Sequence, residues 1–73
     1  MPKVYKASDV YKFLLSLGFQ KVSQKWSHIK LKNDQWLIVI LPMHSKDIPY
    51  WTFLSILAQA NVSLNQAKQF LWK

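Results

Sequence analysis

The first regular pattern of hydrophobic and polar residues along the chain is that of an amphipathic helix. Four apolar residues recur at the spacing that places side chains on one helix face, namely Val10, Phe13, Leu14 and Leu17. Ser8 is expected to cap the first free amides, and Asp9 suits the positive end of the helix dipole. Gly18, the only glycine, is expected to end this helix in a left-handed conformation, with Phe19 folded back on its last turn.

Residues 19–41 change to the two-residue period that is typical of β-strands. In the middle of this segment, one set of alternating residues is Ser27, Ile29 and Leu31, and the other is Trp26, His28, Lys30 and Lys32. The apolar set must point at the helices, because the opposite register would bury the polar set and expose the apolar one. We therefore expect Ser27 to face the helices and His28 to face outward beside the two lysines.

A turn and a third strand follow. Residues 32–35 are typical of a tight hairpin turn, because Asn and Asp tolerate positive φ. Residues 36–41 predict a strand that is apolar on both faces, and Pro42 is expected to end it. The outward side of this strand then carries more apolar residues than a solvent face needs, which is a feature of protein interfaces.

Two further helices are predicted after the loop 42–49. Thr52 is expected to cap the first, whose apolar face consists of Phe53, Ile56, Leu57 and Ala60, and Asn61 is expected to end it. Ser63 and Gln66 have the spacing of a capping box for a short last helix, which carries Leu64, Ala67 and Leu71. The order α-β-β-β-α predicts the α+β class, with a three-stranded antiparallel sheet, helices on one face, and a short C-terminal helix.

Composition sets the size and the compartment of the expected protein. The chain has 73 residues, of which 51% are hydrophobic, so we expect residues 1–73 to form a single folded domain. It contains no cysteine, which excludes disulfides and thiolate zinc sites. The first residues lack the apolar stretch of a signal peptide, and the longest apolar run, 36–41, is too short to span a bilayer. We expect a cytoplasmic protein with no membrane partner.

Charge points to a polyanionic partner. Ten lysines and three aspartates give a formal net charge of +7, which favours nucleic acid, an acidic protein or a lipid surface. Arginine, which reads guanine edges with its planar fork, is absent, so lysines are expected to contact phosphates rather than bases. The alternative, that the lysines only keep an apolar chain in solution, remains open.

The residue inventory leaves few kinds of catalysis. Without glutamate, and with scattered aspartates, a carboxylate pair or a carboxylate magnesium site is not expected. One glycine excludes a glycine-rich phosphate loop, and two histidines do not complete a catalytic zinc site. His28 remains, and a neutral imidazole can take the proton of an RNA 2′-hydroxyl while lysines stabilise the charge that develops. From the residues alone, an ordinary strand-face residue is the favoured interpretation of His28, because one histidine is a weak signal.

Four short motifs occur in a fixed order along the chain: Gly18-Phe19, the segment 24–28 (Gln-Lys-Trp-Ser-His), 41–44 (Leu-Pro-Met-His), and 52–61. In these motifs and their spacing, the chain resembles the HicA toxins of bacterial toxin–antitoxin systems from about Asp9 to Phe70. This resemblance implies a fold like a double-stranded-RNA-binding domain, and a ribosome-independent endonuclease that cuts single-stranded mRNA without metal or other cofactor. It also implies that His28 is the catalytic residue, and that a HicB-like antitoxin protein covers the active face.

Around His28 we expect RNA contacts from several residues, namely Lys25, Trp26, Lys30, His44 and Lys46. His44 is alternatively a residue that holds its loop by hydrogen bonds. Trp26 stands where the family has glycine, and Leu54 and Ala58 replace an arginine and a lysine. The indole of Trp26 either fills space that a nucleotide needs or offers a stacking surface for an unpaired base. Two hypotheses follow: an RNA-cleaving toxin, or an RNA-binding module that pairs with an antitoxin and has lost turnover.

Overall fold

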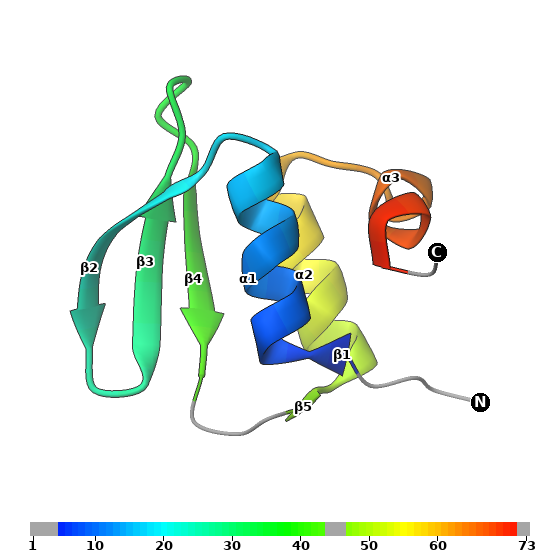
Figure 1. The fold of residues 1–73 in the computed structure, drawn as a ribbon, viewed down its shortest axis with the longest axis horizontal. Helices are drawn as coiled ribbons and strands as arrows, with labels where there is room; N and C mark the ends of the chain where they lie inside the picture. Colours follow the sequence, from blue (N-terminus) through cyan, green and yellow to red (C-terminus); the bar gives the residue numbers. More distant parts are fainter. Residues whose placement is uncertain (1–4, 44–46, 72–73) are drawn as a thin grey trace.

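The computed structural model describes residues 5–43 and 47–71, and these form an α+β fold. The elements in chain order are β1 (Tyr5–Lys6), α1 (Ala7–Ser16), β2 (Gln20–Lys25), β3 (His28–Lys32), β4 (Ile38–Pro42), β5 (Asp47–Ile48), α2 (Tyr50–Ala60) and α3 (Leu64–Leu71). The predicted order of a helix, three strands and a helix, followed by a short helix, is confirmed (Figure 1). The antiparallel pair formed by β1 and β5 was not predicted.

Helix α1 has the predicted buried face and the predicted end. Val10, Phe13 and Leu14 are buried. Gly18 has φ +97°, its amide donates to the carbonyl of Leu15, and the Phe19 amide donates to that of Leu14 at 3.1 Å. These two bonds form a Schellman motif, which satisfies carbonyls at the helix end.

The predicted start of α1 is wrong. Lys6 is the N-cap residue and makes no side-chain capping bond, while Ser8 lies inside the first turn. The reason is tertiary: β1 pairs with β5 and runs directly into α1, so this pairing decides where the helix begins.

The three-stranded sheet has the order β2-β3-β4, and both of its pairings are antiparallel. In the register of β3 and β4, Ile29 lies opposite Leu41 and Leu31 opposite Val39. All four of these residues are buried, and the alternate residues of both strands are exposed or half-buried. Helices therefore cover one face of the sheet, and the predicted register of β3 is correct.

The two edge strands of the sheet are protected against pairing with further strands in different ways. Helices α1 and α2 contact β4, while β2 lies furthest from them, and all six residues of β2 are exposed (Figure 1). A register shift between Lys21 and Ser23 interrupts the pairing of β2 with β3. At the other edge, the Oε1 atom of Gln59 in α2 accepts a bond from the Ile40 amide at 2.9 Å. A lysine-containing, irregular strand at one edge and a helix side chain at the other oppose pairing with further strands.

The connection between β3 and β4 is longer than predicted. Residues 36 and 37 belong to the loop, and β4 begins at Ile38 rather than at Trp36. Asn33 organises this loop, because its Oδ1 accepts bonds from the amides of Gln35 and Leu37 at 3.1 and 2.9 Å. Trp36 has φ 67°, a left-handed conformation that a strand residue does not adopt.

Helix α2 buries the predicted face, namely Phe53, Ile56, Leu57 and Ala60. The predicted cap is wrong, because Pro49 is the N-cap residue and Thr52 lies inside the helix. The predicted end is correct: Asn61 has φ 59°, and the Val62 amide donates to the Leu57 carbonyl.

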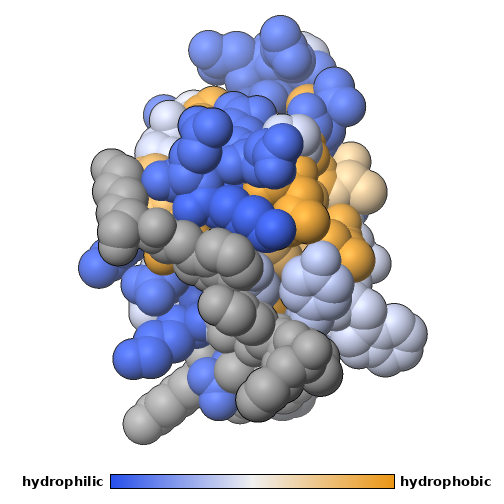
Figure 2. All heavy atoms as spheres, turned by 90° about the vertical axis from the view of Figure 1, so that its right-hand side faces the viewer, coloured by the Kyte–Doolittle hydropathy of each residue, from blue (hydrophilic) through white to orange (hydrophobic). Residues whose placement is uncertain are grey.

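Helix α3 packs against α1 and α2 on the side away from β2 (Figure 1). Its first turn contains one half of the predicted capping box, since the Gln66 amide donates to the hydroxyl of Ser63 at 3.1 Å. The side of the molecule that carries α3 shows hydrophobic residues bordered by hydrophilic ones (Figure 2). Within the described part of the chain, no helix combines the length and the apolar character needed to cross a membrane.

Candidate functional site

His28 is the first residue of β3 and follows a two-residue turn that joins β2 to β3. It lies opposite Lys25 of β2 and opposite Pro42 of β4, and it is exposed. Lys30 is exposed on the same face of the same strand, as predicted. Directly opposed residues of antiparallel strands have Cβ atoms about 5 Å apart, so Lys25 and His28 are close neighbours.

The outward face around His28 carries positive charge without carboxylates. The sequences of β2, β3 and β4 contain four lysines and no acidic residue. The three aspartates are Asp9 in α1, Asp34 in the β3–β4 loop and Asp47 in β5. An anion at this face therefore meets cations on two neighbouring strands.

The prediction that Ser27 belongs to the strand is wrong. It lies in the turn, half-buried, and its carbonyl accepts a bond from the Met43 amide at 2.6 Å. Because Met43 directly follows β4, this bond ties the end of β4 to the turn that precedes His28. Of the predicted contact residues, His44 and Lys46 lie outside the described residues.

Trp26 is the first residue of this turn and has φ 58°. A left-handed conformation is easy for glycine and costs other residues energy, which gives a backbone reason for the glycine found here in the family that the chain resembles. The side chain of Trp26 is 87% exposed, so it does not fill a space inside the molecule.

Trp36 is a second candidate residue, although its apolar neighbours predicted that it lies in a strand. It is 75% exposed and also has positive φ. The Nζ atom of Lys32 lies 3.8 Å from the centre of one of its rings, a cation–π contact. The positive φ of Trp36 follows from the bonds that Asn33 makes within the loop. In the sequence, this conformation was indicated only by the turn-forming residues Asn-Asp-Gln before the tryptophan.

The outward face of β4 is apolar, as predicted. Ile38 lies opposite Lys32 and Ile40 opposite Lys30, and their side chains are 38% and 40% exposed. The outward face of the sheet thus combines a row of cations on β3 with an apolar row on β4.

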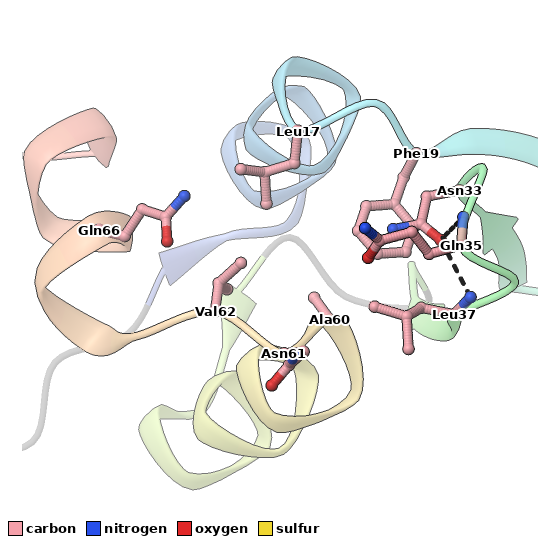
Figure 3. A pocket seen from close by; sticks show the side chains of 9 residues that line it. All are labelled: Leu17, Phe19, Asn33, Gln35, Leu37, Ala60, Asn61, Val62 and Gln66. Atoms are coloured by element: carbon pink, nitrogen blue, oxygen red, sulfur yellow. Dashed lines mark hydrogen bonds between the residues drawn. The ribbon is translucent and has the colours of Figure 1, made fainter.

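A cleft of about 250 Å³ lies at the other end of the sheet, between the β3–β4 loop and the C-terminal ends of α1 and α2 (Figure 3). Its polar lining consists of carboxamides from Asn33, Gln35, Asn61 and Gln66. Since neither histidine nor lysine is among the described residues that line it, this cleft is separate from the site around His28. Among residues 5–43 and 47–71, no three His, Cys, Asp or Glu side chains are grouped to hold a metal ion.

Comparison with known proteins assigns the chain to a family. A search of the curated proteins gave no match. The sequence model of one family, described as the HicA toxin of bacterial toxin–antitoxin systems, matches residues 7–62. The match runs from the first residue of α1 to just beyond the end of α2, and it includes the whole three-stranded sheet and His28. The chain therefore belongs to the HicA family of bacterial toxins.

Proposed function

We propose that this protein is the toxin of a toxin–antitoxin system and acts as an mRNA endonuclease that uses His28. The observation that carries the proposal is the position of His28 on an exposed sheet face, opposite Lys25 and in line with Lys30, in a chain that belongs to the HicA toxins. Histidine changes its charge near neutral pH and can therefore move a proton during catalysis.

In this proposal the imidazole of His28 accepts the proton of a ribose 2′-hydroxyl. The 2′-oxygen attacks the adjacent phosphorus, a new phosphorus–oxygen bond forms, and the bond to the 5′-oxygen of the next nucleotide breaks. The products are a 2′,3′-cyclic phosphate and a 5′-hydroxyl, whose proton comes from water, a lysine or a second histidine. Lys25 and Lys30 stabilise the negative charge that grows on the phosphate oxygens.

The partner that the family implies is an antitoxin, and we propose that a HicB-like protein covers the outward face of the sheet. The exposed side chains of Ile38 and Ile40 give such a partner an apolar surface beside the lysines of β3. An acidic antitoxin surface complements these charges, and an apolar patch fits the centre of the interface.

The test uses labelled single-stranded RNA in the presence of EDTA, with the parent protein and His28→Ala side by side. We expect the parent to cut and the variant to cut about 10²–10⁴-fold more slowly, the usual contribution of a general base or acid. Circular dichroism shows whether the variant is folded. Lys12→Ala, which removes an exposed charge from α1, is the control and is expected to cut like the parent.

The competing function is a module that binds RNA without cutting it. Its support is Trp26, which stands where the family has glycine. If the parent and His28→Ala both retard RNA in a gel and neither cuts, the nuclease proposal fails and the binding function replaces it. If His28→Ala cuts at the parental rate, catalysis by His28 is refuted.

A further inference from the structure

We propose that a single-stranded RNA segment lies along the outward face of β3, with one unpaired base stacked on Trp26 and another stacked on Trp36. This inference rests on the proposed function and adds the path of the substrate and the residues that select unpaired RNA. Trp26 precedes β3 by two residues and Trp36 follows it by four, so the two indoles mark opposite ends of the strand that begins with His28.

Both tryptophans hold positions that are unfavourable for the fold itself. Their side chains are 87% and 75% exposed, so neither contributes substantially to the core. Among the described residues, the only other non-glycine residue with positive φ is Asn61, a residue type that tolerates this conformation. An exposed indole in a strained backbone position points to a binding role, because strain of this kind collects at functional sites.

The contact with Lys32 places Trp36 relative to the sheet. Lys32 lies an even number of residues from His28 and Lys30 along β3 and so shares their outward face of the strand. Its Nζ atom lies 3.8 Å from the centre of a Trp36 ring. This contact holds the indole at the Lys32 end of the outward row while most of its surface stays exposed to solvent. Trp36 is thus a ring with a cation beside it, a combination that suits a base and its phosphate together.

The row between the tryptophans has the repeat of an extended nucleic acid. Outward side chains of a strand recur about every 6.6 Å, which is comparable with the separation of successive phosphates in an extended single strand. His28, Lys30 and Lys32 therefore face about three successive nucleotides, with His28 at a ribose and the lysines at phosphates, and the tryptophans meet bases at either end. A base must leave its neighbours to lie on an indole, so this surface selects single strands over duplexes.

RNA fits this face better than a protein does at these particular positions. Three lysines, Lys25, Lys30 and Lys32, lie on this face, and its strands carry no carboxylate, which complements a polyanion. The apolar residues Ile38 and Ile40 belong to the neighbouring strand, and they do not require a tryptophan at each end of β3.

The experiment measures RNA binding by fluorescence anisotropy with a labelled oligouridine of about eight nucleotides, a length within the range of known single-strand sites. His28→Ala is the background, so that cleavage does not interfere. Trp26→Gly and Trp36→Gly are added separately, because glycine tolerates the positive φ at both positions and preserves the fold. Trp51→Ala is the matched control, since Trp51 is 76% exposed on α2.

We expect each glycine variant to raise Kd about tenfold, within the range found for one stacked base, and Trp51→Ala to leave Kd unchanged. Quenching of tryptophan fluorescence by RNA should fall in the glycine variants, and a duplex of the same length should bind more weakly than the single strand. Unchanged Kd values in both glycine variants refute the inference. If His28-dependent cleavage persists in that case, the proposed nuclease function stands without it.

A protein occupant gives a different result. If the glycine variants bind oligouridine like the background but no longer bind the co-expressed antitoxin, the tryptophans serve protein docking and the RNA path is refuted. Absence of RNA binding by the background protein refutes the RNA path as well, and absence of cleavage by the parent separately refutes the nuclease function.

Discussion

The turn before His28 allows a direct test of the backbone conformation through stability. Trp26 has φ 58° at the first position of a two-residue turn. We consider two replacements, Trp26→Ala and Trp26→Gly. Both remove the same indole, which is 87% exposed, so their comparison cancels the small loss of buried surface and leaves the effect of the backbone.

The expected difference follows from two opposing contributions. A left-handed conformation costs an alanine about 1–2 kcal/mol that glycine does not lose. Glycine has greater conformational freedom in the unfolded chain, and this offsets about 0.5–1 kcal/mol. Taking the middle of each range, Trp26→Gly should therefore be more stable than Trp26→Ala by about 0.75 kcal/mol, which raises Tm by about 3–6 °C in a chain of this size.

Thermal unfolding followed by circular dichroism measures this difference, and denaturant unfolding gives the free energy independently. The control is Ser55, which is exposed in the middle of α2. There Ser55→Gly should be less stable than Ser55→Ala by about 0.8–1 kcal/mol, because glycine is a poor helix former. The sign of the glycine–alanine difference should thus reverse between the two positions. Equal stability of Trp26→Gly and Trp26→Ala would show that the turn does not hold this residue at positive φ.

Three further changes test other parts of the structure. Gly18→Ala should lower the free energy of unfolding by about 0.75 kcal/mol, because φ is +97° and the same two contributions oppose each other as at position 26. No atom lies within 4 Å of the added Cβ, so a clash adds nothing to this loss, and parental stability in denaturant contradicts the prediction. Gln59→Ala should lower the free energy of unfolding by about 0.5–1.5 kcal/mol, because it removes the acceptor of the bond from the Ile40 amide. Gln59→Glu keeps an acceptor oxygen, so equal free energies of unfolding of the two variants in denaturant contradict the role of this bond. Burial, and secondarily the charge of Tyr50, raises the pKa of Tyr5 above 10.0, so the neutral form is favoured in the folded state. The contribution of neutral Tyr5 to stability is therefore fully present below pH 10.0 and is lost as the pH rises through the folded-state pKa. Above pH 10.0 the unfolding free energy of Tyr5→Phe should fall less steeply than that of the parent, and parallel pH profiles of the two proteins contradict this prediction.

The substitution at position 26 bears on both proposed functions. Because its side chain is exposed and the turn requires positive φ, the family glycine is explained by the backbone without a nucleotide in contact. Trp26→Gly therefore separates two effects: a large gain in cleavage indicates that the indole obstructs the active site, and weaker RNA binding indicates that it stacks on a base.

Local patterns in the sequence were sufficient for the elements whose determinants lie close together along the chain. The spacing of Val10, Phe13 and Leu14 predicted the buried face of α1, and Gly18 predicted its left-handed end. The alternation within β3 predicted that His28 faces outward, because only one register buries both of its apolar residues. The order of the elements followed from these short-range periods.

Features that depend on contacts between distant segments were decided by the tertiary structure. The pairing of β1 with β5 moved the start of α1 away from Ser8, and α2 begins after Pro49 rather than at Thr52. In the β3–β4 loop the deciding bonds are local, since the amides of Gln35 and Leu37 donate to the Asn33 side chain. There the apolar residues after Trp36 suggested a strand, and the geometry of the turn placed Trp36 in the loop.

The same distinction explains the candidate site. Which side of β3 carries His28 could be predicted from neighbouring residues, because alternation is a local property. The opposition of Lys25 to His28, the tie from Met43 to Ser27 and the contact of Lys32 with Trp36 depend on the strand register and the turn geometry. Apolar periodicity along the sequence determines which residues are buried, and three-dimensional packing determines which of the exposed residues lie next to each other.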